Sequence, residues 1–403
     1  MIVALEKLEF SKLDPRLLHL SQDEIIQLIN RYYDGETVSK LIKEYKIKIT
    51  PSQLYSIFPP VKSDEKCEHC DSNVVFPWGS KSWSEKLVIN QKFCINCNHS
   101  GRSNCNCIKC LEIRALEEAE KLKIKREEDE RKRNTLKEIT LSKMQNIHLE
   151  DDLTMEDRLY LAVILRASLS EDMKWIEPNS KNFVRMSPTS EYTNEILKTL
   201  ISRDILIVDG ATSDLNSFQE TEKGIVYDML GVKYHLNVVA NDFEEDFNND
   251  GLIKRLIYPD SNLFTKEFCY EMWKRVALEE SKQYLLYQMN KVGYSFSPGE
   301  KTNKVFEFLV ESFSVSQIYN IIYRAIANST TRYQAGEITK IHAQNSVITS
   351  CEKQAERAIA EGWELRGYGR IKDLSESIIS EVLFTSIMKI SYLGFSETPT
   401  PNF

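Results

Sequence analysis

Apolar positions recur at helical spacing in three short segments near the N-terminus. The first opens at a capping box, Ser21-Gln-Asp-Glu24, and Asp34-Gly35 ends it. A second segment covers residues 37–45, and a third starts at Thr50-Pro51, where proline suits the first helical turn. Because Pro59-Pro60 closes this stretch, we predict a module of three short helices within residues 1–61.

The C-terminal region, residues 263–403, has a helical pattern along almost its whole length. Gly293, Pro298-Gly299, Gly336 and Gly362 interrupt the pattern. Helices with mixed apolar faces that lie this close in sequence pack into one compact bundle. The expected helices cover residues 265–292, 301–312, 315–334, 336–361 and 374–391.

Residues 149–240 alternate between helical and strand patterns. A helix begins at Leu153-Thr154, and another opens at Ser187-Pro188 and leads directly into a strand at 205–208. A second strand returns at 234–239. This order resembles a winged helix. The helix before the first strand is no more basic than acidic, and winged helices bind nucleic acid or protein, so the ligand stays open.

Residues 111–148 predict a long charged helix, because Glu and Lys or Arg recur four residues apart. Its apolar residues become too sparse beyond Lys125 for a long coiled-coil seam. We expect a solvated linker helix that could also self-associate. The near balance of acids and bases argues against a basic nucleic-acid arm.

The strongest chemical signal is the cysteine pattern between the N-terminal module and this helix. Cys67-x-x-Cys70 and Cys94-x-x-Cys97 are two knuckles with the spacing of a four-thiolate zinc site. Residues 73–78 and 86–89 are expected to form the hairpin strands between them. We predict a zinc ribbon within residues 62–110.

Three further thiols, Cys105, Cys107 and Cys110, follow closely. With His99 they form a second candidate tetrahedral zinc site, and His69, inside the first knuckle, is an alternative fourth ligand. Free thiols are the other interpretation, although three thiols this close together would invite oxidation. Four ligands at each site leave no open position, which indicates structural zinc.

The helical bundle holds the other concentration of reactive side chains. The candidate ligand-binding residues are Tyr323, Arg324, Arg332, His342 and Asn345. Tyr319 and Tyr323 are four apart on one helical face, and Arg324 could meet His342 across the break at Gly336. Such a set could bind a phosphate or stack a base. A buried polar network is the alternative.

Familiar catalytic motifs are absent from the sequence. It contains no GxxxxGK[ST], GxGxxG, HExxH or GxSxG pattern. Helical ribonucleases of the HEPN type place His four to six residues after Arg, whereas Arg332 precedes His342 by ten. Cys269 and Cys351 lie among apolar neighbours and are expected in the core. The sequence therefore favours a binding protein and leaves an enzyme with dispersed residues open.

An acidic loop is expected at residues 241–262. Asp246, Asn248, Asp250 and Gly251 match the start of an EF-hand calcium loop, but the twelfth position is Ile257 in place of glutamate. A polar turn accounts for this pattern better than a calcium site.

Bulk composition limits the partners. The chain of 403 residues carries a net charge of −8, which argues against nucleic acid over the whole surface but allows a local basic site. No apolar run reaches the length of a membrane span, and charges near the N-terminus disfavour a signal peptide. Metal-type cysteine spacing suits a reducing cytoplasm.

The sequence thus predicts a mainly α, multidomain protein with five modules. The first resembles the helix-turn-helix of resolvases and transposases, although its third helix lacks Arg and Lys, so a protein-binding module is equally compatible. The whole resembles bacterial proteins that join such a start and a zinc ribbon to a helical C-terminal domain. Our leading hypothesis is a bacterial cytoplasmic zinc protein that engages nucleic acid as a regulator or in antiviral defence. A protein-interaction scaffold or complex subunit is the alternative, and a hydrolase or nuclease sited in the bundle is a further one.

Overall fold

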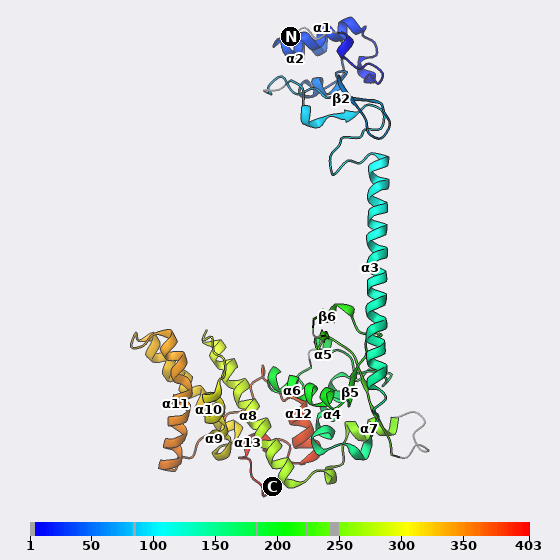
Figure 1. Cartoon of the computed structure of the whole chain (residues 1–403). Helices are drawn as coiled ribbons and strands as arrows, with labels where there is room; N and C mark the ends of the chain where they lie inside the picture. The colour runs from blue at the N-terminus through cyan, green and yellow to red at the C-terminus, as the bar shows by residue number, and fades with distance from the viewer. Residues whose placement is uncertain (1–4, 84–85, 183, 223, 242–249) are drawn as a thin grey trace. The chain divides into compact units, whose positions relative to one another are not determined.

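The computed structural model describes residues 5–83, 86–182, 184–222, 224–241 and 250–403 (Figure 1). The chain is mainly helical, with 55% of residues in helices, and its sheets are small. This part of the prediction is confirmed. By its internal contacts the chain divides into a first unit, Met1–Glu128, and a second unit, Asp129–Phe403.

After two short 3₁₀ helices at Leu5–Lys7 and Pro15–Leu17, the first unit contains α1 (Gln22–Tyr33), α2 (Val38–Glu44) and a longer 3₁₀ helix at Pro51–Ile57. The predicted capping box is present, since the Ser21 hydroxyl accepts from the Glu24 amide and the Glu24 carboxylate accepts from the Ser21 amide. The third segment is not the α-helix that we expected. Its buried residues, Leu54 and Ile57, are three apart, which suits the three residues per turn of a 3₁₀ helix.

The sheet of the first unit differs from the predicted hairpin. Strand β1 (Val61–Lys66) pairs antiparallel with β2 (Asn73–Phe76), which pairs with β3 (Phe93–Cys94). The segment 86–89 contributes only an isolated bridge between Trp78 and Leu87. The first knuckle itself forms the turn between β1 and β2, and closing this short loop costs less entropy than closing the longer one.

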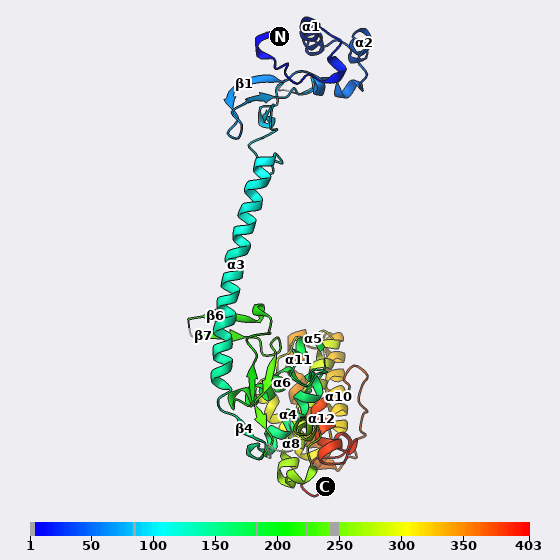
Figure 2. The same ribbon diagram turned by 90° about the vertical axis from the view of Figure 1, so that its right-hand side faces the viewer.

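Helix α3 (Ile108–Lys143) has 36 residues and ends before the predicted residue 148. Its buried residues are Leu136 and Thr140, near its C-terminal end. There the backbone at Gly210 packs directly against α3, because a Cβ added at Gly210 would lie 2.4 Å from Cβ of Leu136. The Lys132 ammonium and the Arg133 guanidinium donate to backbone carbonyls of residues 211–218. Figure 2 shows this end of α3 beside the hairpin of β6 (Phe218–Thr221) and β7 (Gly224–Tyr227).

In the described part of the middle region the strands form three two-stranded sheets. Strand β5 follows α6 directly, β8 pairs with β5, and Ile176 forms a bridge with Tyr234 of β8. Between β5 and β8 the chain forms the β6–β7 hairpin. Strands β4 and β9 pair in parallel. The elements are α4 (Met155–Ser168), α5 (Asn179–Asn182), α6 (Ser190–Ser202), β4 (His148–Leu149), β5 (Leu206–Val208), β6 (Phe218–Thr221), β7 (Gly224–Tyr227), β8 (Tyr234–Leu236) and β9 (Val238–Val239).

The predicted calcium pattern lies partly outside the described residues, which exclude 242–249. Asp250 and Gly251, its described part, open helix α7 (Asp250–Ile257).

The C-terminal helices agree closely with the predicted segments, except that α11 begins at Lys340 and not at residue 336, and that the last segment is divided. Within residues 374–391 it contains a short α-helix and a π-helical turn at Val382–Ile387, and a further short helix lies beyond it. Figure 1 shows α8, α10 and α11 alongside one another. The helices are α8 (Lys266–Lys291), α9 (Glu300–Ser312), α10 (Val315–Gln334), α11 (Lys340–Glu361), α12 (Ile378–Glu381) and α13 (Leu393–Ser396).

One hydrophobic core joins the bundle to the middle region, with members from Leu136 to Phe395. Cys269 and Cys351 are buried in it, as the sequence predicts. Tyr319 of α10 stacks on Tyr284 of α8 with ring centroids 3.7 Å apart. This core therefore fixes α10 against α8, and α11 packs against α10 and α9. Among the described residues, no helix is long and apolar enough to cross a membrane.

Candidate functional site

The predicted four-cysteine set converges in the first unit. The Sγ atoms of Cys67 and Cys97 lie 3.5 Å apart, and Sγ of Cys70 lies 3.3 Å from that of Cys94. Thiolates on one tetrahedral metal, with bonds of about 2.3 Å, lie about 3.8 Å apart. All four sulfur atoms lie within 4.8 Å of one another. This cluster could hold a metal ion.

The two knuckles of this cluster have the same local geometry. In each, the residue after the second cysteine donates its backbone N–H to the carbonyl of the first cysteine, at 2.9 Å for Asp71 and 3.0 Å for Asn98. Both residues adopt the left-handed conformation, with φ of 55° and 58°. Asp and Asn tolerate this conformation better than other non-glycine residues. The sequence thus folds both turns so that four sulfur atoms face one point.

The thiols of the cluster need a positive charge to ionise together. Hydrogen bonding from Ser72 lowers the pKa of Cys70 to about 6. Burial, followed by the neighbouring cysteines, raises the pKa of Cys97 to about 12. A bound cation would remove this conflict by compensating several thiolates at once.

A second cluster lies beside the first. Nδ1 of His99 lies 3.6 Å from Sγ of both Cys105 and Cys107 and 3.3 Å from Sγ of Cys110. His69 also reaches the cluster, with Nε2 at 3.3 Å from Sγ of Cys110. The donor atoms of His69, His99, Cys107 and Cys110 lie within 4.8 Å of one another. This second group could hold a metal ion too, and both of the histidines that the sequence offered are present.

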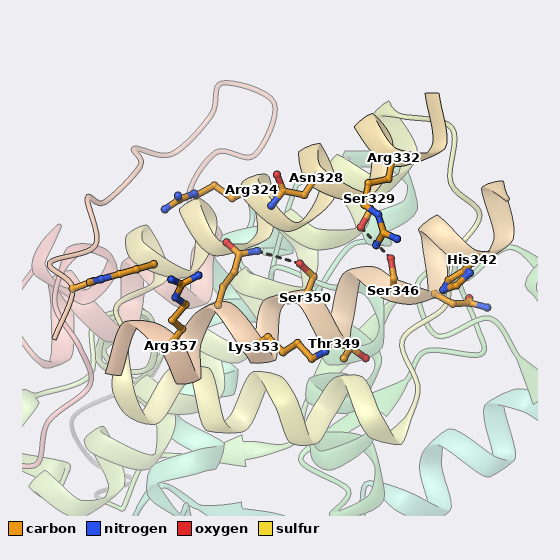
Figure 3. Close-up of a pocket in the computed structure, with 13 residues that line it drawn as sticks. Arg324, Asn328, Ser329, Arg332, His342, Ser346, Thr349, Ser350, Lys353 and Arg357 are labelled. Atoms are coloured by element: carbon orange, nitrogen blue, oxygen red, sulfur yellow. Dashed lines mark hydrogen bonds between the residues drawn. The ribbon is translucent and has the colours of Figure 1, made fainter. Parts of the chain in front are cut away.

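A pocket of about 740 Å³ lies between α10 and α11 in the second unit (Figure 3). Its α11 wall is one continuous helical face at residues 342, 345, 346, 349, 350, 353, 354 and 357. Residues 324, 328, 329 and 332 form the α10 wall, and Trp363 completes the lining. The Ser329 and Ser346 hydroxyls share a hydrogen bond of 3.1 Å, which joins the two walls. We call this pocket the α10–α11 groove.

The α10–α11 groove is positively charged. Four permanent cations line it: Arg324, Arg332, Lys353 and Arg357. None of the described residues in its lining is acidic. Two of the cations pair with exposed carboxylates outside the lining, Arg332 with Glu337 at 3.1 Å and Arg357 with Glu361 at 2.8 Å. Exposed pairs of this kind are weak and exchange readily with another anion.

An exposed aromatic ring closes one end of the groove. Trp363 follows Gly362, whose φ of 62° turns the chain at the end of α11. The Arg357 guanidinium lies 5.0 Å from the centre of its ring, and the indole is 41% exposed. The ring is therefore available for stacking, next to a cation.

The structure brings together most of the candidate residues of the bundle. Arg324, Arg332, His342 and Asn345 all line the groove. Tyr323 does not: it is exposed and packs edge-on against Tyr368. Tyr319, which we expected on the same helical face as Tyr323, is buried in the core and stacks on Tyr284. Arg324 and His342 share the groove without contacting each other, since they project from different ends of it (Figure 3).

Other lining residues were missed at the sequence level. Lys353 and the small polar residues of α11 recur at intervals of three and four, a periodic signal that was available. This polar pattern is hard to recognise because the apolar residues of the same helix recur at similar spacing.

The chain has no significant match among known protein-family models, curated proteins or solved structures.

Proposed function

We propose that the protein binds single-stranded nucleic acid in the α10–α11 groove. The observation that carries this proposal is a lining with four permanent cations and no acid among the described residues. Phosphate contacts supply most of the affinity in such complexes. The remaining lining residues, such as Asn328 and Asn345, offer amide groups to phosphate, sugar or base.

The dimensions of the groove suit a short run of nucleotides. From His342 to Arg357, α11 advances 15 residues, or about 22 Å at about 1.5 Å per residue. Stacked nucleotides rise about 3.4 Å each, so about six would fit along this wall. Trp363 supplies a platform on which a terminal base can stack. An exposed base is available in a single strand and not within a duplex, so we favour a single strand.

Helix α6 is a weaker candidate, although the order of helices and strands around it supports a winged-helix arrangement. Its exposed side chains include Glu191, Glu195 and Lys198, so that face has no net positive charge. Glu195 pairs with Arg275 of α8, and the Thr189 hydroxyl donates to Glu279 of the same helix. These contacts tie α6 to the bundle and leave it poorly suited to enter a groove of DNA.

The two cysteine and histidine clusters support zinc as the metal, because thiolate and imidazole ligands at these spacings suit tetrahedral zinc. Zinc would cross-link the small first unit. A role as a regulator or in defence against mobile elements stays a prediction from the sequence.

The test is binding of a labelled single-stranded oligonucleotide, measured by fluorescence anisotropy on the full chain. The double variant R324Q/K353Q removes two groove cations. The matched control K198Q/K254Q removes two exposed cations from α6 and α7. We expect weaker binding for the first variant and unchanged binding for the second. The reverse result would place the interface on the winged-helix side, and no binding by the native protein would end the proposal.

A further inference from the structure

Both histidines near the second cluster come from the knuckles of the first. His69 lies between Cys67 and Cys70, and His99 follows Cys97 by two residues. The backbone N–H of His69 donates to Sγ of Cys67 at 3.4 Å. The backbone N–H of Cys94 donates to the carbonyl of His99 at 2.7 Å. Each histidine is therefore held in place by a turn of the first cluster.

The second cluster has five donors for four positions, and the distances distinguish them. Tetrahedral bonds of about 2.0 Å to nitrogen and about 2.3 Å to sulfur place those atoms about 3.5 Å apart. Nδ1 of His99 meets this condition with all three thiols, Cys105, Cys107 and Cys110, at 3.3 to 3.6 Å. Among the described thiols, His69 has a hydrogen-bond contact with Cys110 alone.

We infer that the two sites take up metal in a fixed order, the four-cysteine site first, and that His69 positions a ligand of the second site. Until a metal closes the first site, its turns do not hold His99 where the three thiols can use it. The second site is then a Cys₃His site of His99, Cys105, Cys107 and Cys110. His69 donates its Nε2–H to the Cys110 thiolate, as an outer partner that orients a metal ligand.

Other contacts fix the backbone of the segment that carries the thiols of the second site. Arg114, in the first turns of α3, donates to the carbonyl of Cys110 at 3.3 Å and also to that of Cys105. These bonds hold the 105–110 segment independently of the knuckles. The histidine side of the site is thus the part that depends on the first metal.

The test is a stepwise titration of the metal-free full chain with Co²⁺, followed by visible absorption and native mass spectrometry. Cobalt bands distinguish four-thiolate ligation from three-thiolate, one-nitrogen ligation. We expect the first equivalent to give the four-thiolate spectrum and the second equivalent to add the other. Simultaneous filling, or filling of the second site first, would overturn the order.

Variants separate ligation from positioning. C107S/C110S should retain one zinc, whereas C70S/C97S should retain none; one zinc in the latter variant would show that the sites are independent. H99A should lose the second metal. H69A should still bind two metal ions, but its affinity for the second should be about 10- to 100-fold weaker, with the affinity for the first unchanged. H69Q keeps an N–H donor and should therefore recover part of the lost affinity. If H69A loses the second metal and H99A keeps it, His69 is the ligand and His99 is not.

Discussion

Removing Arg324 and Lys353 should change how the affinity for a single strand depends on salt. These two cations have no ion-pair partner among the described residues, so they are fully available to phosphates. Arg332 and Arg357 provide two more contacts once their exposed glutamates are displaced. The native groove therefore neutralises up to four phosphates, and the double variant R324Q/K353Q neutralises two.

These counts give the expected magnitude. For single strands the slope of log affinity against log salt is about −0.7 per phosphate, so it should be about −2.8 for the native protein and about −1.4 for the variant. Between 50 and 200 mM salt, the native affinity should fall by about 50-fold, and that of the variant by about 7-fold.

Anisotropy titrations at four or five salt concentrations measure both slopes. The control K198Q/K254Q should keep the native slope, because it changes the net charge equally but leaves the groove intact. If R324Q/K353Q lowers the affinity and leaves the slope unchanged, the two side chains do not contact phosphates and the reasoning fails. Circular dichroism of each variant checks that the fold is retained.

Three further outcomes follow from the structure. Tyr319→Phe should raise the free energy of unfolding by about 1 kcal/mol, because the buried Tyr319 hydroxyl has no hydrogen-bond partner among the described residues. Tyr234→Phe should lower the free energy of unfolding by about 1 kcal/mol, because the Tyr234 hydroxyl donates to a carbonyl at 2.7 Å. Denaturant titration measures the free energy of unfolding of both variants. Equal effects would contradict the difference in hydrogen bonding between the two hydroxyls. Gly210→Ala should cost about 1–3 kcal/mol because its new Cβ would overlap α3, whereas Gly369→Ala, in open space, should be neutral in the same assay. Glu361→Gln should strengthen oligonucleotide binding by freeing its groove arginine, and weaker binding would speak against that arginine's role.

Local signals in the sequence predicted much of the fold. The capping box at Ser21 and the breaks at Gly293, Gly336 and Gly362 mark helix ends that the structure reproduces. These features act within one or two turns of chain, so a single sequence contains them. The strand partners in the sheet of the first unit did not follow from local signals. Pairing depends on loop closure, and the choice of β1 over residues 86–89 could not be seen from residue types.

The candidate sites were predictable to different degrees. The first cysteine cluster follows from two spaced motifs, whereas the second required geometry, because two histidines and three cysteines compete for four positions. In the bundle, the sequence suggested Arg324, Arg332 and His342. One helix face forms a groove only where a second helix packs beside it, and the sequence does not show which helix that is. One turn of helix separates Tyr323 from the buried Tyr319, yet the two side chains face different surroundings, which spacing alone does not reveal. Self-association through α3 stays a prediction.

The central claim is tested most directly by locating a bound strand on the native protein. Ultraviolet cross-linking of the full chain to a single-stranded oligonucleotide, followed by mass spectrometry of the peptides, identifies the residues in contact. The α10–α11 groove predicts adducts at Trp363 and on peptides from α11. Adducts confined to α6 or to the first unit, with none on α11 or Trp363, would contradict it.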